Sequence, residues 1–148
     1  MKIAGTALLP GTPEQVWDLL NDPQRLAKLL PGCERLDADG PDRYKAVIKF
    51  GLAAVSGTYS GSVQLTDKNP PHSLRLKLDG KGLAGFVTGG GELHLAAKKG
   101  QTEVTYNGEA QVGGLIASVG QRMIEGASRK IIQEFFDRAA RQLQPSKP

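Results

Sequence analysis

GLIASVGQRMIEGASRKIIQEFFDRAARQL, residues 114–143, is the stretch that decides the fold. Apolar and small residues recur in it at intervals of three or four, which places them on one side of an α-helix. That stripe consists of Ile116, Gly120, Met123, Ala127, Ile131 and Phe135. We therefore expect one long amphipathic helix over about residues 115–142, whose apolar side must be covered by another element of the same fold.

The middle of the chain has the period of strands rather than of helices. From Cys33 to about Val112, apolar residues alternate with others, and the runs are separated by turn signals such as DKNPPHS. Three alternating sets should each share one face of a strand: Tyr44, Ala46, Ile48 and Phe50; Val55, Gly57, Tyr59, Gly61, Val63 and Leu65; and Leu74, Leu76 and Leu78. The links are too short for parallel crossovers, so we expect about six strands in an antiparallel meander.

Before this meander, the sequence predicts one strand and two short helices. The strand covers KIAGTALLP, residues 2–10. Thr12-Pro13-Glu14-Gln15 is a helix start with a capping threonine, a proline at the first helical position and a glutamine that completes a capping box. Asp22-Pro23 repeats this start signal, and Pro31-Gly32 ends the second helix.

Together these elements predict an α+β fold in a single domain, residues 1–143, followed by a disordered polar tail, residues 144–148. Seven antiparallel strands form a curved sheet wrapped around the long C-terminal helix, with two short helices after the first strand. A curved sheet and a straight helix cannot touch along their whole length, so a cavity opens between them unless large side chains fill it. The residues expected at this gap are small: Gly57, Gly61, Ala117, Gly120 and Ala127.

Apolar and aromatic residues around this cavity are the candidate ligand-binding residues. Such a pocket suits a lipophilic molecule with one polar end. The candidates are Trp17, Phe50, Tyr59, Leu76, Phe86, Tyr106, Leu115, Ile116, Val119, Gly120 and Met123. Taken singly, the aromatic residues and Met123 are equally typical of a plain core; as a set opposite a glycine-bearing helix they indicate a binding site.

No group of residues in the sequence forms a convincing catalytic or metal-binding set. The two histidines, His72 and His94, would have to meet carboxylates to hold a metal. Gly57–Gly61 reads GTYSG, which is not the G-x-S-x-G of a nucleophile elbow and lies within a strand pattern. Cys33 has no base visible beside it. We expect no catalytic residue, no metal and no resident cofactor.

One short motif, GKGLAG at residues 80–85, fits the G-x-G-x-x-G dinucleotide fingerprint. A Rossmann site needs a helix to begin at the third glycine, and the FVTGGG that follows cannot nucleate one. We interpret DGKG, residues 79–82, as a hairpin turn. A glycine-broken strand or loop then follows near the mouth of the cavity, with Phe86 as an apolar plug.

Charge and composition narrow the class of protein further. The net charge is +4 and the isoelectric point is about 9.3, but the basic residues are dispersed among acidic ones, so we expect no nucleic-acid partner. No run approaches the roughly 18 apolar residues of a membrane span. The first residues resemble no signal peptide, and the single cysteine cannot form an internal disulfide. We expect a cytoplasmic protein with at most peripheral contact at the inner face of the membrane.

Four stretches resemble the carbon monoxide dehydrogenase G-subunit family: PEQVWDLLNDPQRLAKLLPGCERL, GTYSGSVQLTDKNPP, LDGKGLAGFVTGGGELHL and TYNGEAQVGGLIASVGQRMIEGASRKIIQEFFDRAARQL. The resemblance covers nearly the whole chain. It implies the helix-grip fold of the START-related superfamily, which includes polyketide cyclases and lipid-transfer domains. It also implies an accessory protein for a molybdenum-containing dehydrogenase of the carbon monoxide or xanthine oxidase type, with a role in membrane association of the enzyme. It does not imply an active site. Some relatives continue into an apolar C-terminal anchor, whereas this sequence ends at Pro148, which leaves membrane contact to the pocket or to a partner.

Three functions are consistent with these observations. The first is non-enzymatic binding of a hydrophobic small molecule, a quinone or a lipid, in the service of such a dehydrogenase. The second is a cyclase-like or hydrolase-like enzyme, which would need an ionisable group facing the cavity; by alternation Glu92, His94, Glu103 and Glu109 should all point outward. The third is an assembly factor that docks on a partner enzyme without any ligand.

Overall fold

The structure is a computed structural model that describes residues 1–52 and 55–144. The elements follow in the order β1 (Lys2–Pro10), α1 (Pro13–Asn21), α2 (Pro23–Leu29), β2 (Cys33–Ala38), β3 (Arg43–Leu52), β4 (Val55–Asn69), β5 (Ser73–Gly82), β6 (Gly85–Lys98), β7 (Gln101–Gly113), the 3-10 helix η1 (Leu115–Val119) and α3 (Gln121–Leu143). The strands form one seven-stranded antiparallel sheet in the order β1-β7-β6-β5-β4-β3-β2. The α+β fold predicted from the sequence is thus confirmed. Of the predicted polar tail, all but Gln144 lies outside the described residues.

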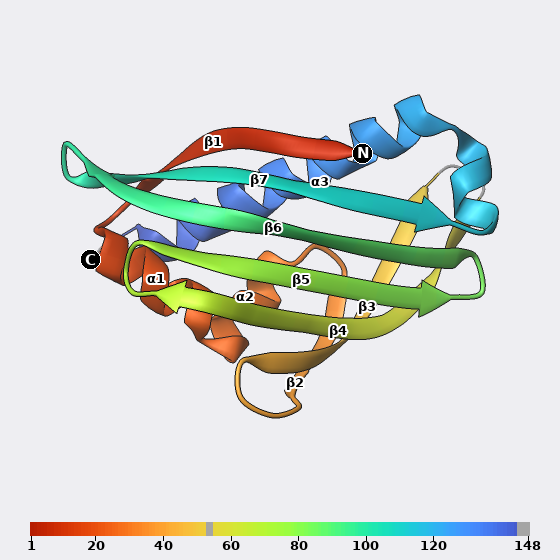
Figure 1. Cartoon of the computed structure of the whole chain (residues 1–148), viewed down its shortest axis with the longest axis horizontal. Helices are drawn as coiled ribbons and strands as arrows, with labels where there is room; N and C mark the ends of the chain where they lie inside the picture. The colour runs from red at the N-terminus through yellow and green to blue at the C-terminus, as the bar shows by residue number, and fades with distance from the viewer. Residues whose placement is uncertain (53–54, 145–148) are drawn as a thin grey trace.

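All three α-helices lie on one face of the sheet. Figure 1 shows α3 running along that face, with α1 and α2 beside its C-terminal part. The predicted caps hold the two short helices: the Thr12 hydroxyl accepts a hydrogen bond from the Gln15 backbone N–H at 3.2 Å, and an Asp22 carboxylate oxygen accepts one from the Gln24 N–H at 3.1 Å. Satisfying these N–H groups fixes where each helix begins. The opposite face of the sheet is left to solvent.

The apolar interior is divided into two clusters. The larger one fills the end of the molecule where α1, α2 and the C-terminal part of α3 meet the sheet. Its buried members are Leu9, Val16, Trp17, Leu19, Leu20, Leu26, Leu29, Tyr44, Leu65, Leu74, Leu95, Val104 and Ala139. The smaller cluster consists of Tyr59, Ala84 and Ile116, with Phe50 and Val112 packed against it. A cavity lies between the sheet and the N-terminal half of α3.

The predicted hairpin turn at DGKG is wrong, because these residues belong to β5. Pairing with β6 continues through Gly80↔Val87 and Lys81↔Phe86 to Gly82↔Gly85, so the turn contains Leu83 and Ala84. The glycines after Phe86 likewise do not form a loop: they lie in β6, paired with β5 on one side and β7 on the other. Glycine weakens a strand but does not prevent pairing on both edges.

The long helix begins later than the sequence predicts. Leu115–Val119 forms the 3-10 helix η1, and Gly120, with φ of 98°, separates it from α3. This left-handed conformation is one that glycine adopts readily and other residues avoid. The predicted apolar stripe includes residues before and after Gly120, and in the folded chain these residues therefore do not lie on one side of a single helix.

Gly126 offers a simple test of the helix itself. It lies inside α3 on the exposed side, and an added Cβ would meet nothing within 4 Å. Because alanine is the better helix former, we expect Gly126→Ala to raise the free energy of unfolding by about 0.5–1 kcal/mol. Thermal unfolding followed by circular dichroism measures this change, and a lowered midpoint would contradict the exposed position of Gly126.

Candidate ligand cavity

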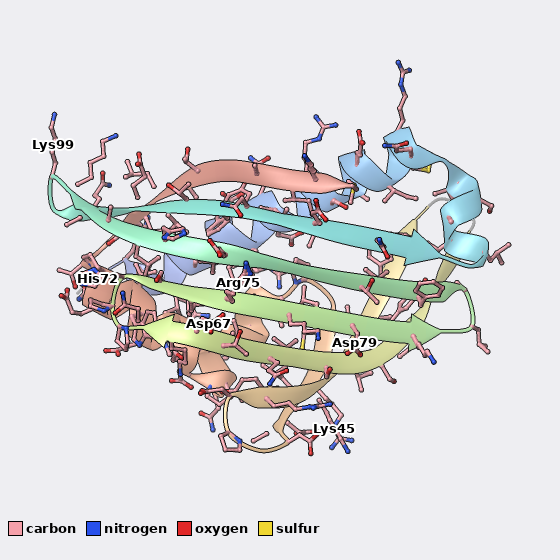
Figure 2. All side chains as sticks on the ribbon, in the orientation of Figure 1. Lys45, Asp67, His72, Arg75, Asp79 and Lys99 are labelled. Carbon is pink, nitrogen blue, oxygen red and sulfur yellow. The ribbon has the colours of Figure 1, made fainter. Side chains whose placement is uncertain are left out.

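The cavity between the sheet and α3 has a volume of about 270 Å³ and an almost entirely apolar wall. On the sheet side, its principal lining residues are Ala46, Ile48, Phe50, Val63, Val87 and Val112. On the helix side they are Ile116 of η1 and Ile124, Ala127, Ser128 and Ile131 of α3. No lysine, arginine or histidine side chain of the described residues lines this space. Its charged lining residues are Met1, whose N-terminal ammonium donates to the Ala110 carbonyl at 3.0 Å, and Asp79, whose carboxylate lies on the exposed face of the sheet (Figure 2).

The register of the sheet explains why the space stays open. One inward-facing row crosses five neighbouring strands and consists of Ala46, Gly61, Gly80, Val87 and Val112. These residues project little or nothing from the sheet. Since α3 presents Ala127 and Ser128 to the same space, side chains from neither layer fill the gap. The predicted opening between sheet and helix is therefore present; of the small residues expected there, Gly61 and Ala127 line it, whereas Gly57, Ala117 and Gly120 do not.

Polar groups around the cavity are few, and most are already bonded. The Ser128 hydroxyl donates to the Ile124 carbonyl at 2.8 Å, and the Ser62 hydroxyl donates to Asp79 at 2.8 Å. The Tyr59 hydroxyl differs, because its oxygen is buried without any hydrogen-bond partner. Burial raises the pKa of this hydroxyl above its ordinary value, so the group stays protonated near neutral pH and is a hydrogen-bond donor.

Three of the candidate binding residues, Phe50, Tyr59 and Ile116, line the cavity. Their side chains meet at one end of it, where the rings of Phe50 and Tyr59 pack edge to face with centroids 6.3 Å apart. These three were predicted from alternation in two strands and from the apolar stripe of the C-terminal stretch. The structure brings them together on one wall.

The other candidates lie elsewhere. Trp17 belongs to the larger core cluster and Leu76 packs against that cluster. Tyr106 stacks on Phe136 with centroids 5.3 Å apart, in a separate groove between β1 and α3. The rest are at the end of the molecule that carries η1 and do not line the cavity: Phe86, Leu115, Val119, Gly120 and Met123. Phe86 is 42% exposed and lies across Gly113, so it does not plug the cavity.

Several lining residues were missed although the sequence contained a signal for them. Ile48 and Val63 belong to the same alternating sets as Phe50 and Tyr59, and once those sets face inward their companions must follow. Ile124 was missed for a different reason. The predicted stripe was counted back from Ala127 to Met123, four residues away, whereas the side of α3 that faces the cavity continues from Ala127 to Ile124, three residues away, and Met123 is 44% exposed.

The ionisable residues that an enzymatic function would need do not line the cavity. Glu92 pairs with Arg75 at 2.9 Å, and His94 lies 3.2 Å from the same carboxylate. Figure 2 shows Arg75 on the face of the sheet turned away from α3. Glu103 pairs with Lys98 at 3.2 Å, and Glu109 is exposed. The alternation argument placed all four outside, and this placement is confirmed.

Within residues 1–52 and 55–144, no three histidine, cysteine, aspartate or glutamate side chains come together in a way that could hold a metal ion. In the same part of the chain, every helix is too short or too polar to cross a bilayer.

A curved antiparallel sheet closed over a C-terminal helix, with an apolar cavity between them, defines the helix-grip class of proteins. Within that class, this chain belongs to the carbon monoxide dehydrogenase G-subunit (CoxG) family, whose sequence model matches residues 5–144. The resemblance drawn from the four sequence stretches is thus confirmed.

The chain is also similar to solved structures and to a curated protein, at different levels of sequence identity. A conserved protein from Geobacillus kaustophilus is 38% identical, with a TM-score of 0.92 over 97% of this chain and 95% of that one. An aromatase/cyclase from a Streptomyces species shares the fold at 13% identity, with a TM-score of 0.67 over 97% and 93% of the two chains. The ribosome association toxin RatA of Escherichia coli is 36% identical over 67 residues, which are 44% of this chain and 42% of that protein. The match thus spans less than half the length of this curated relative.

Proposed function

We propose that this chain is a non-enzymatic accessory protein that binds a hydrophobic small molecule, a quinone or a lipid, in the cavity between the sheet and α3. It serves a molybdenum-containing dehydrogenase of the carbon monoxide dehydrogenase type. The observation that carries the proposal is the apolar cavity of about 270 Å³, lined by aliphatic side chains of both layers. Family membership supplies the dehydrogenase context.

The size and chemistry of the cavity favour an apolar occupant. A dry cavity of about 150 Å³ holds a benzene molecule, so this one has room for about two fused rings or a section of an isoprenoid or acyl chain. Each Å² of apolar surface that leaves water contributes roughly 25 cal/mol. A polar metabolite would lose its hydration here and meet few partners in return.

Exposed apolar side chains support peripheral contact with a membrane. Four of them belong to the β5–β6 turn, the start of β6, η1 and the start of α3, segments that Figure 1 draws at one end of the molecule; the exposed basic residues Lys81 and Arg122 are close to them in sequence. The apolar members are Leu83, Phe86, Leu115 and Met123. Exposed apolar groups clustered next to positive charge suit an anionic lipid surface. This end also holds Ile116, which lines the cavity, so membrane contact here would bring the bilayer next to the closed end of the binding space.

Purification from the native host tests the proposal. We expect solvent extraction and mass spectrometry of the purified protein to recover a quinone or a lipid at close to one molecule per chain. The protein stripped of ligand should take up the same compound again in equilibrium dialysis. A chain that is empty in every preparation and has no affinity for quinones or lipids would overturn the proposal.

A further inference from the structure

The Tyr59 hydroxyl is an unusual group in this cavity. Among the described residues, two buried side-chain oxygens have no hydrogen-bond partner, the amide oxygen of Asn21 and the hydroxyl of Tyr59. Asn21 lies at the end of α1, and its amide nitrogen is bonded to the Trp17 carbonyl at 2.9 Å. Tyr59 is 8% exposed, and its ring forms part of the cavity wall.

This unpartnered hydroxyl is costly to the free protein. A buried hydroxyl without a partner costs on the order of 1–3 kcal/mol, whereas phenylalanine at the same place would fill the same space without that cost. The neighbours of the ring are apolar: Phe50, Ala84, Val112 and Ile116. None of their side chains can accept a hydrogen bond. The group therefore destabilises the free state and lacks a structural purpose there.

Water is a poor partner for this hydroxyl, and a ligand oxygen is a good one. An ordered water needs two to four polar partners, and the aliphatic wall offers it little besides Tyr59. A ligand brings its acceptor on an apolar body and needs no second polar contact. A neutral acceptor fits better than a carboxylate, because the lining contains no basic side chain to compensate a buried negative charge, and the Met1 ammonium at its edge is already bonded to the Ala110 carbonyl at 3.0 Å.

We propose that the Tyr59 hydroxyl donates a hydrogen bond to a neutral carbonyl oxygen of the bound ligand and so selects ketones, quinones or esters over hydrocarbons and fatty acids. This inference rests on the proposed function, since it assumes that the cavity is the binding site. Ala84 and Ile116 cover the ring at this end, and the Ile116 N–H donates to the Ala84 carbonyl at 2.6 Å. Because the hydroxyl oxygen is buried in the structure, the proposal requires that the side chains packed on the ring, Ile116 among them, move aside when the ligand enters.

Three naphthalene probes of matched size test the selectivity: 2-acetylnaphthalene, 2-ethylnaphthalene and 2-naphthoate. We expect isothermal titration calorimetry to give Tyr59→Phe an affinity for the ketone about 3- to 10-fold weaker than that of the wild type, the net value of one neutral hydrogen bond. Affinity for the hydrocarbon should not change, and the carboxylate should bind both proteins most weakly. In infrared spectra, the carbonyl stretch of the bound ketone should lie at lower frequency in the wild type than in Tyr59→Phe.

Two controls separate this role from a structural one. Tyr106→Phe removes a hydroxyl from a residue outside the cavity and should leave all three affinities unchanged. The unliganded Tyr59→Phe protein should be at least as stable as the wild type, because it loses an unpartnered group.

The outcomes distinguish the two proposals from each other. If no probe binds the wild type, the cavity is not a binding site and both proposals are wrong. If the probes bind but Tyr59→Phe weakens ketone and hydrocarbon equally, or weakens neither, then only the role of Tyr59 is overturned. A marked loss of stability in unliganded Tyr59→Phe would also overturn it, because the hydroxyl would then have a partner in the free protein.

Discussion

Gly85→Ala is expected to lower the free energy of unfolding by about 2–4 kcal/mol, which combines backbone strain with overpacking. Gly85 has φ of 131°, a conformation that an alanine avoids. A Cβ at this position would also overlap the Gly113 carbonyl oxygen of the neighbouring strand and approach the Ile116 side chain at 3.1 Å. For a chain of this length the loss corresponds to a fall of roughly 5–15 °C in the unfolding midpoint.

Gly120→Ala is the matched control for this variant. Gly120 also has positive φ, 98°, but a Cβ there would meet nothing within 4 Å. Its replacement should therefore cost only the conformational term of about 1–2 kcal/mol. The difference between the two midpoints in thermal unfolding isolates the overlap with Gly113. Equal losses would show that β6 and β7 are not as close at Gly85 as the structure has them.

The junction at Gly85 also bears on the cavity. Ala84, next to it in the β5–β6 turn, accepts the hydrogen bond from Ile116, and Ile116 lines the cavity. A displaced Gly85 moves the turn that holds η1 in place. The same close packing that makes Gly85 hard to replace therefore closes one end of the binding space.

Local signals in the sequence were sufficient to predict the order of the helices and strands and how they pack in layers. Thr12 and Asp22 act through residues two or three positions away, so their helix starts are readable without any tertiary information. The alternation of apolar residues within each strand is equally local, and it predicted the sets of inward-facing residues that contain Phe50 and Tyr59. Together with the long C-terminal stripe, these signals determine how many layers the fold has and which faces meet.

Tertiary contacts decided what the sequence did not predict. The β5–β6 turn falls at Leu83 and Ala84 rather than at DGKG, because β5 and β6 remain paired up to Gly82↔Gly85. Likewise, the chain leaves helical geometry at Gly120. The pattern of apolar and small residues does not reveal this break, because a glycine is compatible with the small side of a helix as well as with a break in it. Within α3 itself, Ile124 faces the cavity and Met123 faces out, one position away from the predicted stripe, so the candidate site was partly misplaced on the helix side.

Ala127→Phe is expected to abolish ligand binding while the fold is kept. Ala127 faces the cavity from α3, and the larger ring would enter space that the natural side chains leave empty. Because the ring occupies a void, its burial should leave stability unchanged or raise it by about 0.5–2 kcal/mol, as cavity-filling substitutions commonly do. We expect affinity for the extracted native ligand to fall at least about 100-fold, a loss of roughly 2.7 kcal/mol of binding free energy.

Lys130→Phe supplies the matched control, since it places the same ring on an exposed position of the same helix. This variant should bind ligand as the wild type does in equilibrium dialysis. Ligand binding that survives in Ala127→Phe would show that the ligand site lies outside the cavity.

A test with the partner enzyme distinguishes ligand binding from the assembly-factor hypothesis. If Ala127→Phe loses its ligand and yet the dehydrogenase still couples normally to the membrane, the chain acts as an assembly factor and the cavity is incidental. The proposed function predicts instead that the variant still associates with the dehydrogenase and that electron transfer to the membrane is lost, because the proposal places docking on the outer surface and the ligand in the cavity.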